Sequence, residues 1–171
     1  ELEKINRYSK TPLTAEQVYR FQVRLCDDQP DRDLERFDRA SLPRLAELFR
    51  GKTGILDHEW SAKGQVARIY DTEVREEGHE AWILASCYML RTEKNADLIA
   101  DIEGGIRREV SVGCAMGKAT CSICGQPYGV CEHRKGERYG GRQCLAVLSE
   151  PTDAYEFSFV AVPAQRQAGV T

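Results

Sequence analysis

Four side chains of the kind that bind zinc fall within thirteen residues of this chain: Cys121, Cys124, Cys131 and His133. The stretch is too short to bury an apolar core of its own. Its Cys-x-x-Cys pair lets one tight turn direct two thiolates at a single point, and the glycines and proline that follow can return the last two side chains there. Three sulfurs and one nitrogen complete a tetrahedron and leave no open position for water. The sequence therefore predicts a structural zinc site, with a disulfide or uncoordinated thiols as the alternative.

The composition is typical of one globular domain spanning residues 1–171. The chain is 42% hydrophobic and 30% charged, a balance that supports a core and argues against disorder. Seven cysteines, an odd number, and the lack of a signal-peptide pattern or a long apolar run favour a reducing, cytosol-like compartment without a membrane partner. The net charge of −3 is dispersed, so extended nucleic-acid binding is not expected. The one basic stretch surrounds the cysteines, with Lys118, Arg134, Lys135, Arg138 and Arg142.

The hydrophobic pattern predicts a mainly β fold with flanking helices. Residues 19–25 alternate between apolar and polar side chains, as a half-buried strand does, and residues 81–90 form a longer apolar run that we expect at the centre of a sheet. Further strands are predicted at 64–74, 110–116, 143–148 and 155–162. A short helix is expected after Ser41 as N-cap, ending near Gly51, and a second after Thr92, ending at Gly104. Residues 117–142 lie between two of these strands and are predicted to form a hairpin insertion within the domain that is held together by zinc.

Three polar residues in or beside apolar strands are candidates for chemistry: Ser111, His58 and Glu156. A serine hydroxyl needs a base within hydrogen-bond reach before it can act as a nucleophile near neutral pH, and histidine is the usual base. His133 is taken by the predicted metal, and His79 lies in a charged turn, which leaves His58. A carboxylate such as Glu156 could hold the other ring nitrogen of that base. Taken alone, each signal is weak, because a serine in a strand is more often structural and a single histidine before a tryptophan is more often a packed ring than a base.

The chain resembles the phage prohead proteases, serine peptidases of capsid maturation that are related in fold to the herpesvirus assemblins. The resemblance runs over most of the chain through four landmarks: Asp33-Leu34-Glu35-Arg36-Phe37, Gly54-Ile55-Leu56-Asp57-His58, Glu109-Val110-Ser111-Val112-Gly113, and the closing run from Tyr155 to Gln165. It implies a β-barrel core flanked by helices. It also implies catalysis by a serine, a histidine and an acidic third member, which carry over to Ser111, His58 and Glu156.

The resemblance further implies what the protein acts on and where. The expected substrates are the scaffold and the major capsid protein of an immature capsid, and the protease itself by autocleavage, inside the assembling prohead in the bacterial host cytoplasm. The start at Glu1 instead of a methionine suggests a fragment and is compatible with self-trimming.

Two points depart from the family pattern or stay open. The zinc segment is not a general family feature and reads as a subgroup insertion. The third catalytic member is a histidine in the viral relatives, so His133 is an alternative to Glu156. Cys144 or Cys114 would then have to replace His133 as a metal ligand. Glu150 and Asp153 are further acidic candidates for the third member. The Gly140-Gly141-Arg142 turn is a candidate oxyanion loop, with a plain hairpin turn as its alternative.

Functions of other classes fit the same residues. In one, the chain is a zinc-dependent binding or assembly module whose basic segment contacts capsid, scaffold or nucleic acid, and the strand of Ser111 is merely core. In another, it is an inactive relative that keeps the fold and only assembles. The cysteines outside the cluster, Cys26, Cys87, Cys114 and Cys144, are expected to be small buried hydrophobes.

Overall fold

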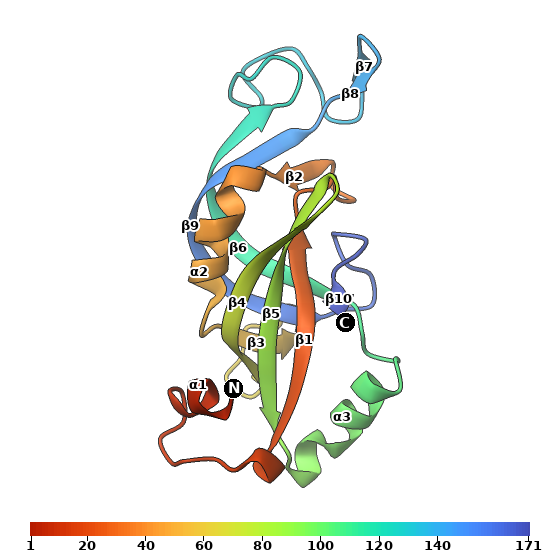
Figure 1. Cartoon of the computed structure of the whole chain (residues 1–171). Coiled ribbons are helices and arrows are strands. Elements are labelled where there is room, and N and C mark those ends of the chain that lie inside the picture. Colours follow the sequence, from red (N-terminus) through yellow and green to blue (C-terminus); the bar gives the residue numbers. More distant parts are fainter.

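The period-two segments of the sequence form an antiparallel three-stranded meander. The computed structural model describes residues 1–171 (Figure 1), and in it β5 (Glu80–Leu90) lies between β1 (Val18–Asp27) and β4 (Ala67–Glu77). Both faces of β5 are largely buried, which confirms the prediction of a central strand. In β1 the alternating side chains predicted to face inward are buried: Tyr19, Phe21, Val23 and Leu25.

Further strands extend the sheet on both sides of the meander. Its order is β10-β1-β5-β4-β3-β9-β2, with β6 paired to β9 off this path. The added strands are β2 (Glu35–Phe37), β3 (Thr53–Leu56), β6 (Val110–Cys121), β9 (Ala146–Phe159) and β10 (Gly169–Val170). The sheet is mixed because β2 and β3 run parallel to β9, while the other pairs are antiparallel.

The expected β-barrel is wrong in one respect: the sheet does not close. The two-residue strand β10 pairs with β1 on one side. On its other side a single bridge joins Gly169 of β10 to Glu109, the residue before β6. Closure of a barrel needs a continuous hydrogen-bonded ladder between its first and last strands. With only a two-residue strand and one bridge at this seam, the sheet remains open there.

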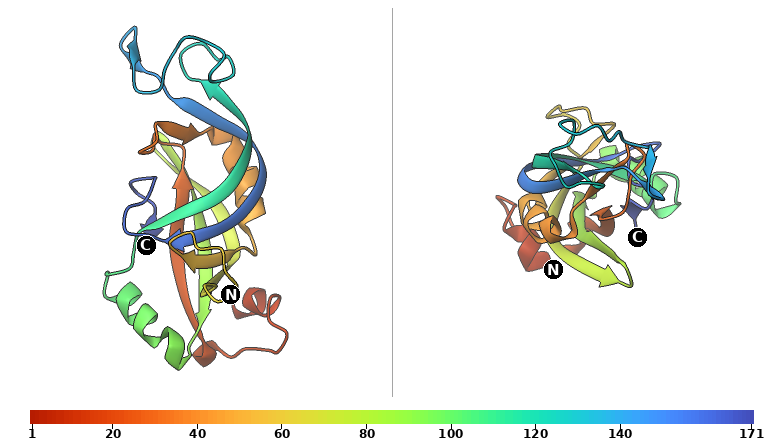
Figure 2. Two further views of the ribbon diagram at one scale, coloured as in Figure 1. Left: turned by 180° about the vertical axis from the view of Figure 1, so that it is seen from behind. Right: turned by 90° about the horizontal axis from the view of Figure 1, so that it is seen from above.

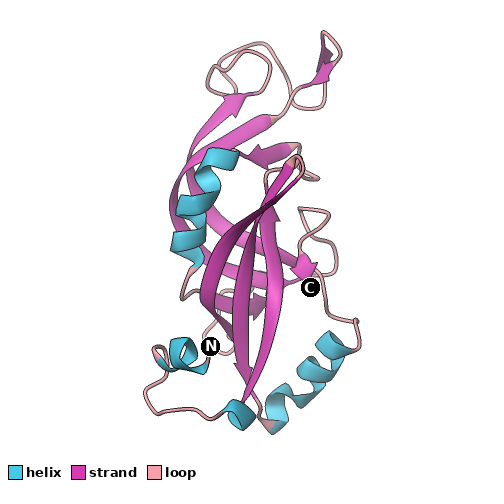
Figure 3. Cartoon of the chain, viewed as in Figure 1, coloured by secondary structure: helices cyan, strands magenta, loops and turns pink.

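Three short helices flank the sheet. They are α1 (Leu2–Asn6), α2 (Leu42–Phe49) and α3 (Ala96–Glu103), and none of them is long and apolar enough to cross a membrane. In Figure 3 α2 runs along the sheet, and α1 and α3 lie near its lower end. The helix predicted after Ser41 is α2, but Ser41 makes no capping hydrogen bond because a 3₁₀ turn, Arg39–Ser41, leads into the helix. Thr92 does cap the turn before α3, accepting a hydrogen bond from the backbone of Asn95.

One hydrophobic core joins these elements. The buried faces of α2 and α3 pack with the inner faces of β1, β4, β5, β6 and β9 in a cluster of 25 residues. The closing Pro-Ala-Gln run is tied to the end of β1, because the buried Gln165 side chain accepts from Asp27 N–H and donates to Asp27 C=O, at 2.7 and 3.0 Å. The C-terminal segment is thereby held against the strand that leads to residues 28–33.

The strands β6 and β9 form a long antiparallel arm (Figure 2). Two separate strands were predicted at 143–148 and 155–162, but the structure has the single strand β9, paired with β6 from Val110↔Phe159 to Cys121↔Ala146. Register shifts after Gly113 and after Ala115 accommodate the extra residues of β9. The predicted insertion, residues 117–142, makes up the far end of the arm, together with the small hairpin β7 (Arg138–Tyr139) and β8 (Arg142–Gln143).

Gly54 gives a test of this packing, because it lies between β9 and β4 where no side chain fits. A Cβ atom at this position would lie 2.5 Å from Phe157 Cζ and 3.0 Å from the Ala67 Cβ. We expect Gly54→Ala to lower the free energy of unfolding by about 1–3 kcal/mol, the usual cost of overpacking, as measured by urea denaturation. The same substitution should cost less in a Phe157→Leu background, which lacks the contacted ring atoms. Equal costs in both backgrounds would contradict this account.

Candidate active site and metal centre

The side chains of His58 and Glu156 are hydrogen-bonded to each other. His58 Nδ1 lies 2.8 Å from Glu156 Oε1, and the carboxylate is almost completely buried, with 3% of the side chain exposed against 41% for His58. An ionised carboxylate can only accept, so the ring nitrogen that faces it carries the proton. The other ring nitrogen, Nε2, is then left with a free lone pair. This is the tautomer that a general base requires.

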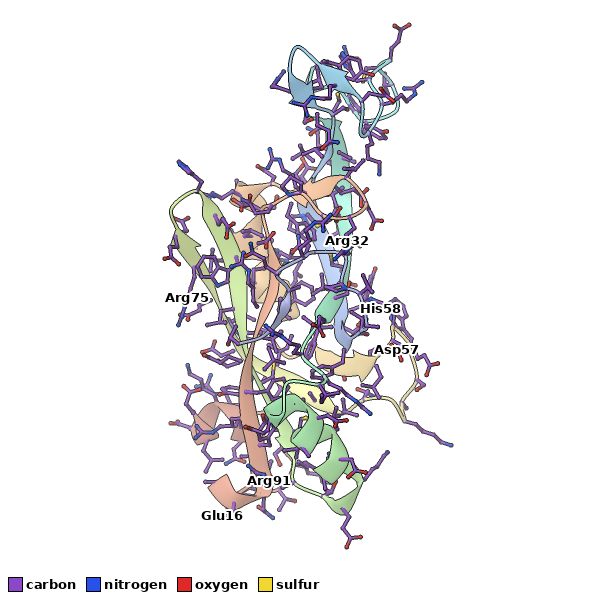
Figure 4. All side chains as sticks on the ribbon, turned by 90° about the vertical axis from the view of Figure 1, so that its right-hand side faces the viewer. Glu16, Arg32, Asp57, His58, Arg75 and Arg91 are labelled. Carbon is purple, nitrogen blue, oxygen red and sulfur yellow. The ribbon has the colours of Figure 1, made fainter.

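The backbone turn after β3 brings His58 back to Glu156. Because β3 runs parallel to β9 and pairs Leu56 with Phe159, a straight continuation would carry His58 past the carboxylate. Instead Asp57 and His58 both adopt the left-handed region, with φ of 52° and 54°. Left-handed conformations are unfavourable for residues other than glycine and persist where the surroundings hold them. Figure 4 places both residues beside the β6–β9 pair.

Ser158 holds this turn and the carboxylate together. Its hydroxyl donates to Glu156 Oε2 at 2.7 Å and accepts from the backbone N–H of His58 at 3.0 Å. With the ring contact to Oε1, these bonds form a closed network that fixes His58 at both its backbone and its side chain. Sequence reasoning missed Ser158. The available signal was a second polar residue, two positions after Glu156 and so on the same face, in an otherwise aromatic run.

Gly113 makes room for the carboxylate. It lies directly opposite Glu156 in the pairing of β6 with β9, and a Cβ atom there would overlap Glu156 Oε1. Any side chain at this position would push the carboxylate away from His58. The glycine is therefore a requirement of the His58–Glu156 contact.

Ser111 lies on the same face of the arm as Glu156 and Ser158. It is paired with Ser158, while Gly113 is paired with Glu156, and directly opposite residues of an antiparallel pair share a face. Diagonal neighbours in such a pair are about 7–8 Å apart, a gap that an imidazole bonded to the carboxylate can span. No hydrogen bond joins Ser111 to His58 in the structure. The structure thus joins His58 and Glu156 directly and places Ser111 diagonally across the β6–β9 pair from Glu156.

Two pockets border these residues. The first, of about 400 Å³, is lined by Ser111 and Gly113 together with apolar side chains such as Val112 and Met116. The second, of about 370 Å³, has Glu156 in its wall and two aromatic rings, Trp60 and Tyr155, whose centroids are 5.1 Å apart. Trp60 is 69% exposed, which is unusual for so large an apolar side chain. The site is therefore open to a ligand from more than one side.

The alternative residues for chemistry are less well placed. Burial raises the pKa of Cys114 to about 11, and the negative charge of Glu156 acts in the same direction, so this thiol stays protonated and weakly nucleophilic at neutral pH. His133 lies in the cysteine cluster at the other end of the arm. Neither Glu150 nor Asp153 makes a hydrogen bond or ion pair with His58, whose only side-chain partner is Glu156.

The four predicted metal ligands do come together. The donor atoms of Cys121, Cys124, Cys131 and His133 all lie within 4.8 Å of one another, and Cys121 Sγ is 3.6 Å from His133 Nδ1. Zinc bonds of about 2.3 Å to sulfur and 2.0 Å to nitrogen place tetrahedral ligands about 3.5–3.8 Å apart. The cluster therefore fits a zinc ion, and the four ligands would leave no position for a substrate.

The turn around Cys121 favours the thiolate that a metal binds. The backbone N–H of Ile123 donates to Cys121 Sγ at 3.4 Å, and Gly125 N–H closes the turn on Cys121 C=O at 2.9 Å. Burial acts to raise the pKa of Cys121, but the hydrogen bonds from its neighbours outweigh it and lower the pKa to about 6. A thiolate at neutral pH is thus available before any metal arrives.

The suggested oxyanion loop is not at the site. Arg142 lies in the hairpin at the far end of the arm, where its guanidinium donates to the carbonyl of Ile123 at 3.2 Å. Ser111 is separated from this end by ten residues of extended strand, or about 33 Å. The alternative of a hairpin turn is the one that the structure supports for Gly140-Gly141-Arg142.

We expect Gly113→Ala to break the hydrogen bond between His58 and Glu156, because its Cβ would occupy the space of Oε1. The measurement is proton NMR of the imidazole N–H, which is shifted to low field and protected from exchange while it donates to a carboxylate. Gly117→Ala, on the same strand but away from Glu156, is the matched control and should keep the signal. A signal unchanged in Gly113→Ala and lost in Glu156→Gln would contradict the predicted overlap.

Comparison with known proteins adds no second line of support for this site. No family model, curated protein or solved structure matches the chain. The assignment of the site therefore depends on the residues and geometry described above.

Proposed function

We propose that the protein is a serine endopeptidase of capsid maturation, with Ser111 as nucleophile, His58 as base and Glu156 as the third member. The observation that carries the proposal is the buried carboxylate bonded to His58 Nδ1, on the strand face that also presents Ser111. A histidine held in one tautomer by a buried acid beside a serine is the arrangement that acyl transfer requires. The resemblance of the landmarks to the prohead proteases points to the same three residues.

The proposed reaction follows from the roles of these groups. His58 Nε2 removes the proton of the Ser111 hydroxyl as its oxygen attacks a peptide carbonyl, and Glu156 stabilises the imidazolium that forms. The imidazolium then donates its proton to the leaving amine, and the acyl-enzyme is hydrolysed by a water that His58 activates in turn. His58 must first approach Ser111, as catalytic hydrogen bonds in free enzymes often tighten only when substrate binds.

The proposed substrates are the scaffold, a removable part of the major capsid protein and the protease itself. Their cleavage would take place inside the assembling prohead in the bacterial host. The pockets beside Ser111 and Glu156 support a peptide ligand, since each has an apolar part that could receive a side chain next to the cleaved bond, and the first also carries the carboxylates of Asp31, Asp33 and Glu35.

Replacing the nucleophile is the first test. We expect Ser111→Ala to lower cleavage by about 10⁴-fold or more, because acyl transfer has no other nucleophile at the site. Self-cleavage during expression, and cleavage of a proteome-derived peptide library analysed by mass spectrometry, are the measurements. Ser149→Ala, on β9 but outside the network, is the matched control and should keep full activity. Full cleavage by the Ser111→Ala variant would rule out the proposed mechanism.

A zinc-dependent binding or assembly module is the second candidate function. It is favoured by the position of the metal cluster, at the far end of the arm and among basic residues, where Val130 is 71% exposed. In this case binding to capsid, scaffold or nucleic acid would survive Ser111→Ala and fail when the metal is removed. The two functions are compatible in one chain, because their sites occupy opposite ends of the arm.

Removal of the metal tests whether the cluster and the proposed active site, at opposite ends of the arm, act independently. We expect a strong chelator to increase hydrogen exchange in residues 121–144 while the core strands stay protected, because the metal supplies most of the stability of this segment. Peptide cleavage should change by less than about three-fold, since Ser111 lies about 33 Å along the strand from the cluster. Loss of cleavage with an intact core would mean that the metal organises the active site.

A further inference from the structure

A fifth side chain of a type that binds metals, Cys144, lies next to the cluster. Cys144 Sγ is 3.8 Å from Cys121 Sγ, and Cys144 is fully buried. The backbone fixes its position on both sides, since Cys144 N–H donates to Glu137 C=O at 2.8 Å and Gly136 N–H donates to Cys144 C=O at 2.9 Å. Cys144 is thus as firmly placed as the predicted ligands, although it lies eleven residues beyond the last of them.

The spacing of the two sulfurs is that of two ligands of one zinc ion. With zinc–sulfur bonds of about 2.3 Å, two thiolates at neighbouring corners of a tetrahedron are about 3.8 Å apart. The two thiols are not joined as a disulfide, because all seven cysteines are free. Cys121 therefore has two neighbours at ligand spacing, Cys144 at 3.8 Å and His133 at 3.6 Å.

We propose that Cys144 is a ligand of the same metal and shares the fourth position with His133. A tetrahedral ion bound by Cys121, Cys124 and Cys131 has one corner left, and two donors lie beside Cys121. His133 belongs to the group of donors that all lie within 4.8 Å of one another, whereas Cys144 lies at its edge and would take the corner by moving toward the other thiols. With His133 bound, the site has three sulfurs and a nitrogen; with Cys144 bound, it has four sulfurs. Both sets are common for structural zinc.

The choice of ligand changes what the metal connects. Cys121 is the last residue of β6, and Cys144 lies two residues before β9 begins, so a metal bound by both joins the two long strands directly. His133 lies in the loop between them and makes no such link. Ligation by Cys144 would hold β6 and β9 at the register in which Ala146 pairs with Cys121.

Metal binding by four variants tests the proposal: wild type, His133→Ala, Cys144→Ala and the double variant. Zinc affinity is measured by competition with a chromogenic chelator, and Co²⁺ is used as a spectroscopic probe. Each single variant should still bind one metal ion, and the double variant should bind at least ten-fold more weakly than either. In His133→Ala the sulfur-to-cobalt charge-transfer band should grow, by up to about one third, as the fraction of sites that have three thiolate ligands changes to four such ligands.

Cys87→Ala controls for the loss of a buried thiol, because Cys87 is fully buried in the core and far from the cluster in the sheet. It should bind metal as the wild type does. If His133→Ala bound metal no better than the double variant, Cys144 would not be a ligand. If Cys144→Ala alone lost the metal while His133→Ala kept it, the shared position would be wrong. These readouts do not involve peptide cleavage, so they are independent of the proposed peptidase function.

Discussion

The antiparallel pairing of β6 with β9 is the interaction on which both candidate sites depend. Near one end it sets Gly113 opposite Glu156 and Ser111 opposite Ser158, and at the other it sets Cys121 opposite Ala146. A slip of one residue would turn Glu156 to the core face and remove the space that Gly113 provides. Between the stretches where β9 also pairs with β2 and with β3, the arm is a two-stranded ribbon, and such ribbons are marginally stable alone. A metal at the tip and core packing at the base would stabilise the same pair of strands.

The end of the arm near His58 combines unfavourable features that its hydrogen bonds offset. A carboxylate buried at Glu156 is unfavourable unless its oxygens are bonded, and two successive left-handed residues add strain to the turn. Ser158 and the His58 ring satisfy both oxygens, while the His58 N–H bond to Ser158 holds the strained turn. Structures keep such arrangements where position matters more than stability. The strained turn and the buried carboxylate support a functional role for His58.

The sequence predicted local elements of structure better than it predicted contacts between distant segments. The alternation in β1, the apolar run of β5 and the helical spacing of α2 depend on neighbouring residues, and these elements form as expected. The clustering of Cys121, Cys124, Cys131 and His133 followed from their short spacing. The open seam, the continuity of β9 and the role of Ser158 depend on register between distant segments, which spacing alone does not determine. The sequence predicts Cys144 as a small buried hydrophobe, and as a metal ligand only if His133 serves catalysis, because only the fold brings it to Cys121.

The proposed activation of Ser111 by His58 and Glu156 is tested most directly by covalent labelling with a serine-directed phosphonate. Such a reagent reacts only with a hydroxyl that a base has activated, so peptide mass spectrometry of the labelled protein identifies the nucleophile without knowledge of the substrate. The account predicts one adduct, on Ser111, that is lost in His58→Ala and strongly reduced in Glu156→Gln. Labelling at another serine, or labelling of Ser111 that persists unchanged without His58, would contradict it.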